Sequence, residues 1–334
     1  MQFVLQEPLL VHRLLKNYFK LVVLKKNVLR SVEVDLGFDC QLNCKHCYAQ
    51  KMKNSQRKEL TFIELKDIVD QCVQLGTVYF FISGGEPLLY KEKLLQLVKY
   101  IKNTHTYAAL VTNGQKLEKR LLEQLKIAGL DLIMVSIDSH NKKVHDNNRN
   151  KKGCYRKAID GIRLAKKMGF KVFTSTVLTQ EKINRNEIAN IIRINKKIGV
   201  ESHFCFPVPI GNWNNKENVI LNKSYWDMIK KSFKKNDIRM CEEGNYIKKG
   251  CSAGIEKIAI TCYGDVMPCP YIQITFGNLK DKKLKDILKI MNKNKYFKDM
   301  NEFCLPASNK KFIKEYINGI RKCKKLPLII KRKS

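Results

Sequence analysis

The strongest constraint on the fold is a regular alternation of two hydrophobic patterns from residue 30 onward. Short runs rich in β-branched and aromatic residues alternate with longer segments whose apolar residues recur at helical spacing. Such alternation is typical of parallel sheets, in which each helix returns the chain to the same edge of the sheet. The strand-like runs are 31–37, 78–83, 107–112, 132–138, 171–178 and 201–206, and the helical segments are 62–75, 89–102, 117–128, 155–168 and 185–197.

This pattern predicts an α/β fold, as either an open doubly wound sheet or an incomplete (β/α)6 barrel of the TIM type. In both architectures the functional residues gather at the carboxyl ends of the strands. After residue 212 the pattern changes to polar loops and scattered cysteines, which indicates a small cysteine-rich α+β extension. We therefore expect an N-terminal helical segment over 1–29, a core over 30–212, and the extension with its tail over 213–334.

The N-terminal segment has the pattern of an amphipathic helix. Its apolar stripe consists of Val11, Leu14, Leu15, Tyr18 and Val22. The opposite side carries Arg13, Lys16, Asn17 and Lys20. The favoured interpretation is a helix that packs on the body of the protein. The alternative is a basic helix in peripheral contact with a membrane surface.

The composition limits the classes of partner. The net charge is +33, but most of the 64 basic residues are lysines scattered along the chain, without the arginine clusters typical of nucleic-acid interfaces. A bound nucleic acid is therefore the less favoured interpretation. The chain has no secretory signal pattern and no run of about 18 apolar residues, which favours a cytoplasmic protein. In a reducing compartment the 12 cysteines are expected to be metal ligands, catalytic thiols or buried apolar residues.

Three cysteines follow the first predicted strand directly, in the stretch CQLNCKHC at 40–47. A structural zinc site uses four ligands and closes its coordination shell. A [4Fe–4S] cluster also takes four ligands, so a loop that supplies Cys40, Cys44 and Cys47 leaves one iron for an outside ligand. A small molecule with a chelating group would complete that shell.

This C-x3-C-x2-C loop resembles the cluster motif of the radical S-adenosylmethionine (SAM) superfamily. The resemblance implies that SAM chelates the unique iron through its amino and carboxylate groups. It also implies reductive cleavage of SAM to methionine and a 5′-deoxyadenosyl radical, which abstracts hydrogen from a substrate. His46 stands where that family usually has an aromatic residue.

Further motifs follow in the order of that family. SGGEP at 83–87 resembles its GGEP motif, which implies that Gly84, Gly85, Glu86 and Pro87 hold the SAM amino group. The resemblance also implies that Asn113, Ser136 and Asp138, at the ends of two predicted strands, contact the SAM ribose, although ordinary capping of strand ends is an alternative for them. The glycine-rich motif that the family has around its fifth strand is not recognisable here.

The C-terminal cysteines resemble the auxiliary-cluster extension called SPASM, or its shorter twitch form. The resemblance rests on CSAG at 251–254, CYGDVMPCP at 262–270 and FGN at 276–278. It implies one auxiliary [4Fe–4S] cluster on Cys251, Cys269 and Cys304, whereas a zinc site or buried inert thiols are the alternatives. The usual closing C-x2-C is missing, so the fourth ligand is open between Cys323, which we favour, Cys262 and Cys241; an iron left open to the substrate is a further alternative.

The resemblance implies an iron–sulfur oxidoreductase that acts on an organic substrate, with a ribosomal peptide favoured. A dehydrogenase or epimerase acting on a sugar, lipid or other small molecule, and an RNA-modifying enzyme, are the alternatives. A non-catalytic iron–sulfur carrier is disfavoured, because a carrier needs no amine-binding GGEP loop. An external electron donor of the flavodoxin or ferredoxin type is the expected partner.

Overall fold

The computed structural model of the chain describes residues 8–214, 216, 219–233, 238–241, 246, 250–301 and 303–330. Within these residues, nine strands form one sheet in the order β7-β6-β5-β4-β3-β2-β1-β8-β9. All neighbouring strands are parallel except β8 and β9. These strands are β1 (Ser31–Asp35), β2 (Tyr79–Ser83), β3 (Tyr107–Thr112), β4 (Leu132–Ser136), β5 (Lys171–Val177), β6 (Glu201–Cys205), β7 (Ile238–Met240), β8 (Lys257–Ile260) and β9 (Val266–Met267). A small second sheet pairs β10 (Ile274–Thr275) with β11 (Leu328–Ile329).

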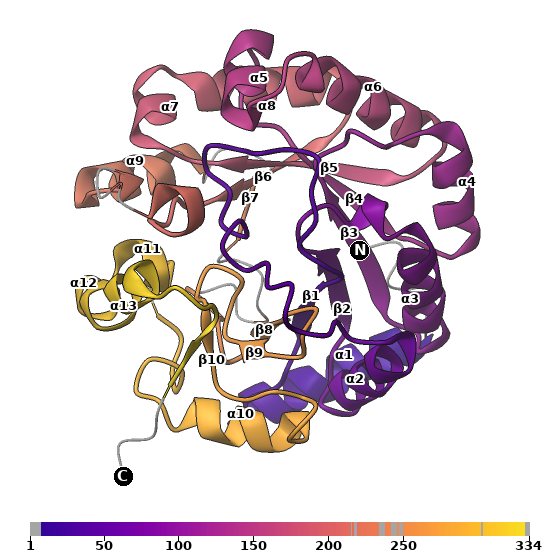
Figure 1. Cartoon of the computed structure of the whole chain (residues 1–334), viewed down its shortest axis with the longest axis vertical. Coiled ribbons are helices and arrows are strands. Elements are labelled where there is room, and N and C mark those ends of the chain that lie inside the picture. The colour runs from indigo at the N-terminus through magenta and orange to yellow at the C-terminus, as the bar shows by residue number, and fades with distance from the viewer. Residues whose placement is uncertain are drawn as a thin grey trace.

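Helices surround the curled sheet on its outside (Figure 1). They are α1 (Pro8–Val22), α2 (Phe62–Gln74), α3 (Lys91–Asn103), α4 (Lys119–Ile127), α5 (Lys142–Arg149), α6 (Cys154–Lys167), α7 (Gln180–Asn184), α8 (Glu187–Lys197), α9 (Lys223–Phe233), α10 (Leu284–Asn292), α11 (Leu305–Ser308), α12 (Lys310–Phe312) and α13 (Asn318–Lys322). The curl does not close, because β7 and β9 end the sheet on its two sides. The prediction of an incomplete parallel barrel is thus confirmed. The short helices α5 and α7 were not predicted, because neither carries a long apolar stripe.

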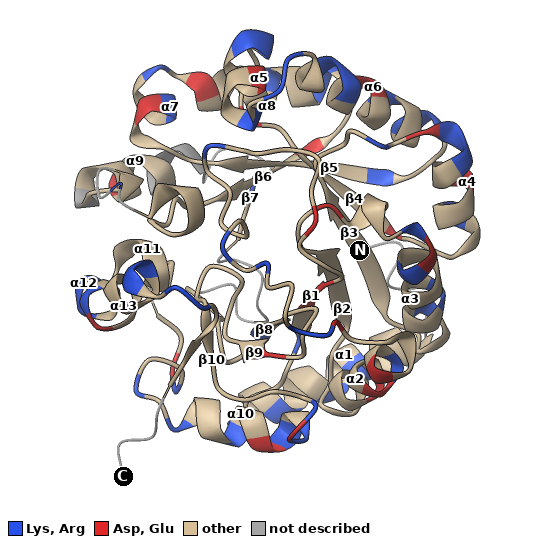
Figure 2. Ribbon diagram, in the orientation of Figure 1, with Lys and Arg blue, Asp and Glu red and all other residues tan. Residues whose placement is uncertain are grey.

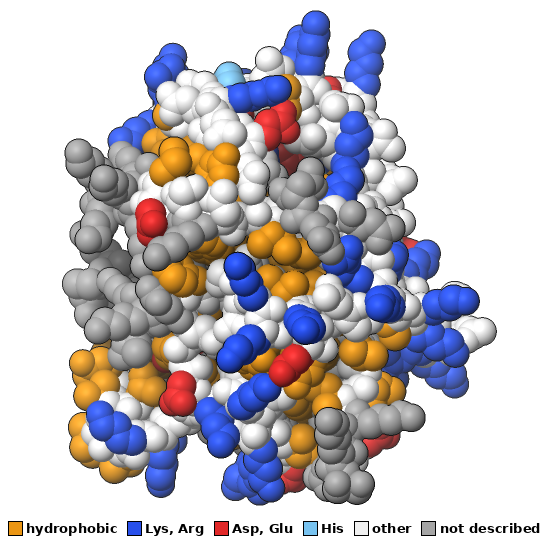
Figure 3. Space-filling view, turned by 90° about the vertical axis from the view of Figure 1, so that its left-hand side faces the viewer, with side chains coloured by type: hydrophobic (Ala, Val, Ile, Leu, Met, Phe, Trp, Pro, Cys, Tyr) orange, Lys and Arg blue, Asp and Glu red, His pale blue; other side chains and the backbone are white. Residues whose placement is uncertain are grey.

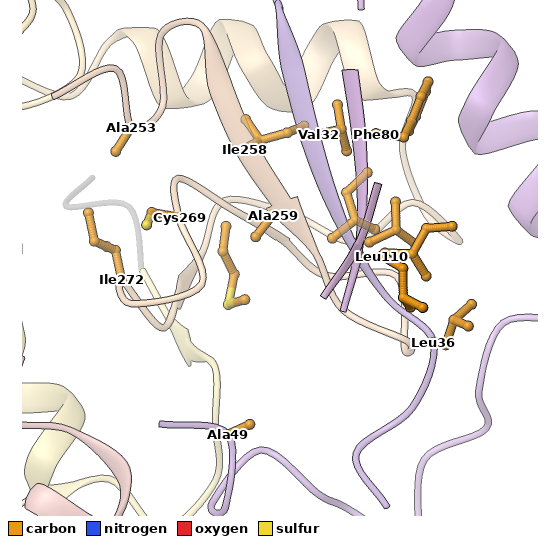
Figure 4. Packing of buried hydrophobic residues seen from close by; sticks show 14 of the residues in the cluster. Val32, Leu36, Ala49, Phe80, Leu110, Ala253, Ile258, Ala259, Cys269 and Ile272 are labelled. Atoms are coloured by element: carbon orange, nitrogen blue, oxygen red, sulfur yellow. The ribbon is translucent and has the colours of Figure 1, made fainter. Parts of the chain in front are cut away.

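The two faces of the barrel sheet pack differently. The outer face forms the main core: Val32, Phe80 and Leu110 point from adjacent strands toward the helices and are completely buried (Figure 4). Alternate residues point into the barrel lumen, where a small apolar cluster contains Met134 and Phe173. Since side chains alternate along a strand, the same face of β1 and β2 carries polar groups into the lumen.

The C-terminal extension continues the barrel wall. Strand β8 pairs in parallel with β1, in a register that joins Ser31 to Lys257, and β9 returns from it as an antiparallel hairpin. Gly264 and Asp265 lie in the turn between these two strands. The division of the chain at residues 29 and 212 stays a prediction, since one sheet runs through both the core and the extension.

The N-terminal helix packs through only part of the expected apolar stripe and through part of its polar side. Leu10 and Asn17 are buried, whereas Leu15 and Tyr18 of that stripe are exposed. Arg13 and Asn17 instead donate hydrogen bonds to backbone carbonyls of the loops that precede β2 and β3. Carbonyl groups at such loops need donors when they are covered, and the polar side of the helix supplies them.

Basic side chains are spread over the molecule. Figure 2 shows Lys and Arg distributed over the outer helices, and Figure 3 shows them interspersed with hydrophobic side chains on another face. Such a distribution differs from the concentrated basic stripe that a nucleic-acid interface shows. Among the described residues, no helix combines the length and the apolar character that crossing a membrane requires.

Candidate active site

The three cysteines of the first motif lie in the loop after β1, at the carboxyl end of the parallel strands. The side-chain amide of Asn113 lies 3.6 Å from Cys40 Sγ, and Arg149 Nη1 lies 3.7 Å from Cys44 Sγ. Burial raises the pKa of the Cys44 thiol, and raises that of Cys47 to about 11. Buried thiols become thiolates when a metal binds them, and N–H donors aimed at sulfur stabilise that charge. The loop thus fits three ligands of an iron–sulfur cluster.

A buried ion pair supports this loop from α5. Arg149 Nε lies 2.7 Å from Asp138 Oδ2, and Arg149 Nη2 donates to Asp138 Oδ1 at 3.0 Å. Burial alone would raise the pKa of Asp138, but the Arg149 charge outweighs it and holds that pKa below its ordinary value. His46 Nε2 lies 3.4 Å from the same carboxylate, and burial lowers the pKa of His46 to about 4. The guanidinium of Arg149 therefore links the Cys44 thiol to a fixed carboxylate.

The loop after β6 holds the cysteine loop from its other side. Asn212 donates from its side chain to the carbonyl of Cys44 at 2.7 Å and from its backbone to the carbonyl of Cys47 at 3.0 Å. Gly211 precedes it with a φ of +59°, and a Cβ there would collide with the carbonyl oxygen of Cys47. The glycine is required because the two backbones are in direct contact. Neither Asn212 nor Arg149 was predicted, since neither belongs to a recognisable motif.

The glycines of the GGEP stretch pack against the backbone that leads to Cys40. Gly85 N donates to Gly37 O at 2.9 Å, and Glu86 N donates to Asp39 O at 2.8 Å. A Cβ on Gly84 would collide with the carbonyl oxygen of Gly37, and a Cβ on Gly85 with that of Asp39. The sequence predicts close approach of this backbone to a ligand; the structure shows close approach to the cysteine loop itself. These contacts bring the GGEP stretch beside the cysteine loop.

The carboxylate of Glu86 is completely buried and already has partners. It accepts hydrogen bonds from Thr112 Oγ1 at 2.8 Å, from the backbone N–H of Leu88 at 3.1 Å, and from that of Asn113 at 2.8 Å. Pro87 opens the short helical turn that the Leu88 bond caps. Glu86 thus ties the loop after β2 to the end of β3, and it holds Asn113 beside Cys40.

The two remaining candidates lie at the end of β4. Ser136 is half-buried, faces the lumen, and stands opposite Ser175 in the sheet register. Asp138 lies two residues further on, but its carboxylate faces Arg149 and His46. The structure therefore leaves Ser136 available to a ligand and gives Asp138 another partner.

Two acids line the lumen next to this site and were not predicted. Ser83 Oγ lies 2.8 Å from Glu33 Oε1 and 2.9 Å from Asp35 Oδ1. Burial, reinforced by the charge of Glu33, raises the pKa of Asp35 to about 8. Asp35 Oδ2 is buried without a hydrogen-bond partner among the described residues. Acids at alternate positions of an otherwise apolar strand are the signal that could have identified this pair.

The extension brings several thiols together at the barrel wall. The thiol of Cys241 contacts those of Cys205 and Cys304, and Cys251 interacts electrostatically with Cys304 and with Cys269. Four cysteines, 241, 251, 269 and 304, suffice for a cubane cluster, and their convergence from separate segments fits such a group. Cys205 adds a fifth thiol from β6.

The other two candidates for the fourth ligand lie elsewhere. The Cys323 thiol is partly exposed and donates to the backbone carbonyl of Lys325 at 2.8 Å. Cys262 is buried in the β8–β9 turn, where its backbone carbonyl accepts from Leu60 N. Of the three candidates, Cys241 is therefore the one that the structure brings to the other thiols.

Lys257 connects the two regions. Its Nζ lies 3.8 Å from Glu33 Oε2, and the charges of Cys269 and Glu33 outweigh burial to raise the pKa of this lysine. Lys257 thus lies close both to the acid pair on β1 and to the extension thiols.

Comparisons with known proteins match both regions. The family model described as the radical SAM superfamily matches residues 34–194, and the model described as an iron–sulfur cluster-binding domain, SPASM, matches residues 251–324. An AdoMet-dependent heme synthase of Methanosarcina barkeri is 28% identical over 290 residues, which cover 78% of this chain and 82% of the relative. A PqqA peptide cyclase of Gluconobacter oxydans is 24% identical over 277 residues, which cover 78% of this chain and 76% of that protein.

Solved structures share the fold. Streptococcus suis SuiB bound to its precursor peptide SuiA superposes with a TM-score of 0.65 at 15% identity, over 92% of this chain and 74% of SuiB. The protein anSMEcpe with bound AdoMet gives a TM-score of 0.58 at 20% identity, over 88% of each chain. At these identities the likeness concerns the arrangement of the barrel and its extension.

Proposed function

Because the chain belongs to the radical SAM superfamily and carries a SPASM domain after its radical SAM domain, we propose that it oxidises an organic substrate held in the barrel lumen between two iron–sulfur sites. The observation that carries this proposal is the position of Lys257, which pairs with Glu33 in the lumen and interacts with Cys269 of the extension thiols. When bound, the catalytic [4Fe–4S] cluster with SAM supplies a 5′-deoxyadenosyl radical, and an auxiliary cluster supplies an acceptor for the electron left on the substrate. The protein itself contributes binding, orientation and exclusion of water.

We assign the residues as follows. Cys40, Cys44 and Cys47 hold the catalytic cluster, and Asn113 donates to its Cys40 ligand. Gly84, Gly85, Glu86 and Pro87 form the wall at which SAM binds, with Ser136 on the facing strand. Asp138 acts indirectly: its carboxylate holds the guanidinium of Arg149, which lies beside the Cys44 thiol. Cys241, Cys251, Cys269 and Cys304 hold the auxiliary cluster.

We favour a peptide substrate because of the acid pair beside the SAM wall. Asp35 is buried and Glu33 is half-buried, and both have raised pKa values because removal from water disfavours their charged forms. Such groups accept hydrogen bonds from amide donors, and when protonated they also donate to carbonyl oxygens. A peptide offers both kinds of group in every amide, so it suits the lumen beside this acid pair.

A tetrapyrrole is the second candidate. The heme synthase of M. barkeri matches over most of both chains. Lys257 supplies one half-buried cation that a carboxylate side chain of a tetrapyrrole could approach. This candidate requires the tetrapyrrole to bind on the Lys257 side and away from Asp35.

The test compares the two substrates directly. The anaerobically reconstituted protein is incubated with SAM, a reductant, and either a short peptide encoded beside its gene or an iron porphyrin bearing carboxylate side chains. The proposal expects 5′-deoxyadenosine formation that depends on the peptide, together with a peptide product that has lost two hydrogen atoms. A mass change of the porphyrin alone would transfer the assignment to the second candidate. Radical formation without change to either substrate would refute both.

The Glu33→Gln variant tests the role of the lumen acid. It keeps the size of the side chain but removes the charge next to Lys257, so we expect weaker peptide binding with an unchanged iron content. Glu201→Gln is the matched control, because Glu201 lies on β6 at the surface and pairs with Arg239. Equal KM values for the two variants would contradict a substrate contact at Glu33.

A further inference from the structure

The outward surface of α1 and the turn after it is apolar. Six large hydrophobic side chains are exposed there, from 46% for Leu24 to 65% for Leu15. They are Leu9, Leu15, Tyr18, Phe19, Val23 and Leu24, which we call the docking face. An amphipathic helix normally buries its apolar side, so a helix that exposes this side indicates a partner.

Polar contacts fix the orientation of this helix. Asn17 Nδ2 donates to Gly76 O at 2.6 Å and to Tyr246 Oη at 2.8 Å, and Arg13 Nη2 donates to Thr104 O at 3.1 Å. Rotating α1 to bury the docking face would break all three bonds and leave the buried Asn17 amide without partners. The docking face is therefore held outward by the fold.

Charge distinguishes between the candidate occupants of this face. Residues 8–26 contain five basic residues and no acidic one. Exposed lysines also end α4, α6 and α8, at the end of the barrel where α1 contacts the loops before β2 and β3. A second copy of this chain would place one charge of +33 against another. An anionic lipid surface offers both the apolar depth and the opposite charge.

We propose that the docking face binds the protein to an anionic lipid bilayer. Leu15, Tyr18 and Phe19 enter the boundary between headgroups and acyl chains, and the lysines around them meet the lipid phosphates. The cysteine loop lies at the carboxyl ends of the strands, which is the opposite end of the barrel. In the docked orientation SAM and the electron donor therefore reach the active site from the aqueous side.

The test is co-flotation of the full-length protein with vesicles. Phosphatidylcholine vesicles are compared with vesicles of phosphatidylcholine and phosphatidylglycerol in equal amounts. We expect recovery with the anionic vesicles that falls as salt is raised. The double variant Leu15→Glu/Phe19→Glu should lower the partition coefficient about tenfold or more, because two apolar anchors become charged. The matched control is Ile63→Glu/Met228→Glu, which changes the net charge equally at exposed positions on α2 and α9.

Three results would overturn the proposal. The first is absence of the wild-type protein from the anionic vesicles. The second is an equal loss of binding in the control variant, which would show that net charge alone is responsible. The third is a dimer in sedimentation that Leu15→Glu/Phe19→Glu dissociates, which would make a second copy the occupant. Circular dichroism of each variant checks that the chain is folded.

Discussion

Replacing Arg149 by methionine would test whether the ion pair behind the cysteine loop determines the stability of the core. Arg149 and Asp138 are 8% and 0% exposed, and their side chains meet at 2.7 and 3.0 Å. Arg149→Met removes the cation but leaves the buried carboxylate of Asp138, so we expect the free energy of unfolding to fall by about 3–5 kcal/mol. The double variant Arg149→Met/Asp138→Asn removes both charges, so a coupling of roughly 1–3 kcal/mol should recover part of this loss.

The assay is urea unfolding of the iron-free protein under reducing conditions, because a bound cluster would add its own stabilisation. Arg185→Met is the matched control: Arg185 also pairs with an acid, Glu181, at 2.9 Å, but both side chains are exposed. That variant should cost less than about 0.5 kcal/mol. Equal losses for Arg149→Met and Arg185→Met, or exact additivity of the two changes at 149 and 138, would refute the reasoning.

Three further predictions concern the site. The folded-state pKa of Asp35, about 8, lies above its ordinary value of 3.8, so the folded protein retains a proton that the unfolded chain loses. The free energy of unfolding should therefore fall by roughly a few kcal/mol as the pH rises between these values, and Asp35→Asn should flatten this slope in urea titrations. Cys241→Ser should lower the iron content of the reconstituted protein from about eight to about four, whereas Cys323→Ser should leave it unchanged; the opposite pattern would restore Cys323 as the ligand. Gly85→Ala should abolish SAM binding in equilibrium dialysis, because its Cβ meets the carbonyl of Asp39; retained binding would show that the two loops can separate.

The elements that sequence analysis located best are those whose periodicity is strong. All six predicted strands and five core helices form within a few residues of their expected positions, because alternation and helical spacing report burial directly. The α1 prediction was correct in position, but only part of its stripe packs on the protein: Val11, Leu14 and Val22 are half-buried, whereas Leu15 and Tyr18 are exposed. Periodicity identifies an apolar side, and it carries no information on which side finds carbonyl partners such as Gly76 O and Thr104 O.

Within the site, sequence analysis identified the residues that belong to a short local motif. Cys40, Cys44 and Cys47 follow one strand, and the GGEP stretch follows the next, so their proximity results from parallel strands ending at one edge. Asn212 and Arg149 carry no such pattern, and their contacts join segments that are 168 and 105 residues away in the chain. Long-range contacts of this kind are not encoded in local spacing.

The sequence by itself determined the parallel barrel, the family and the three-cysteine loop, because each depends on residue type at short, regular spacing. Only the tertiary structure decided that Cys241 joins the extension thiols, that Asp138 is committed to Arg149, and that Glu33 and Asp35 share the lumen with Lys257. The physical reason is burial: side chains distant in the chain acquire partners and altered pKa values only when folding removes water from between them.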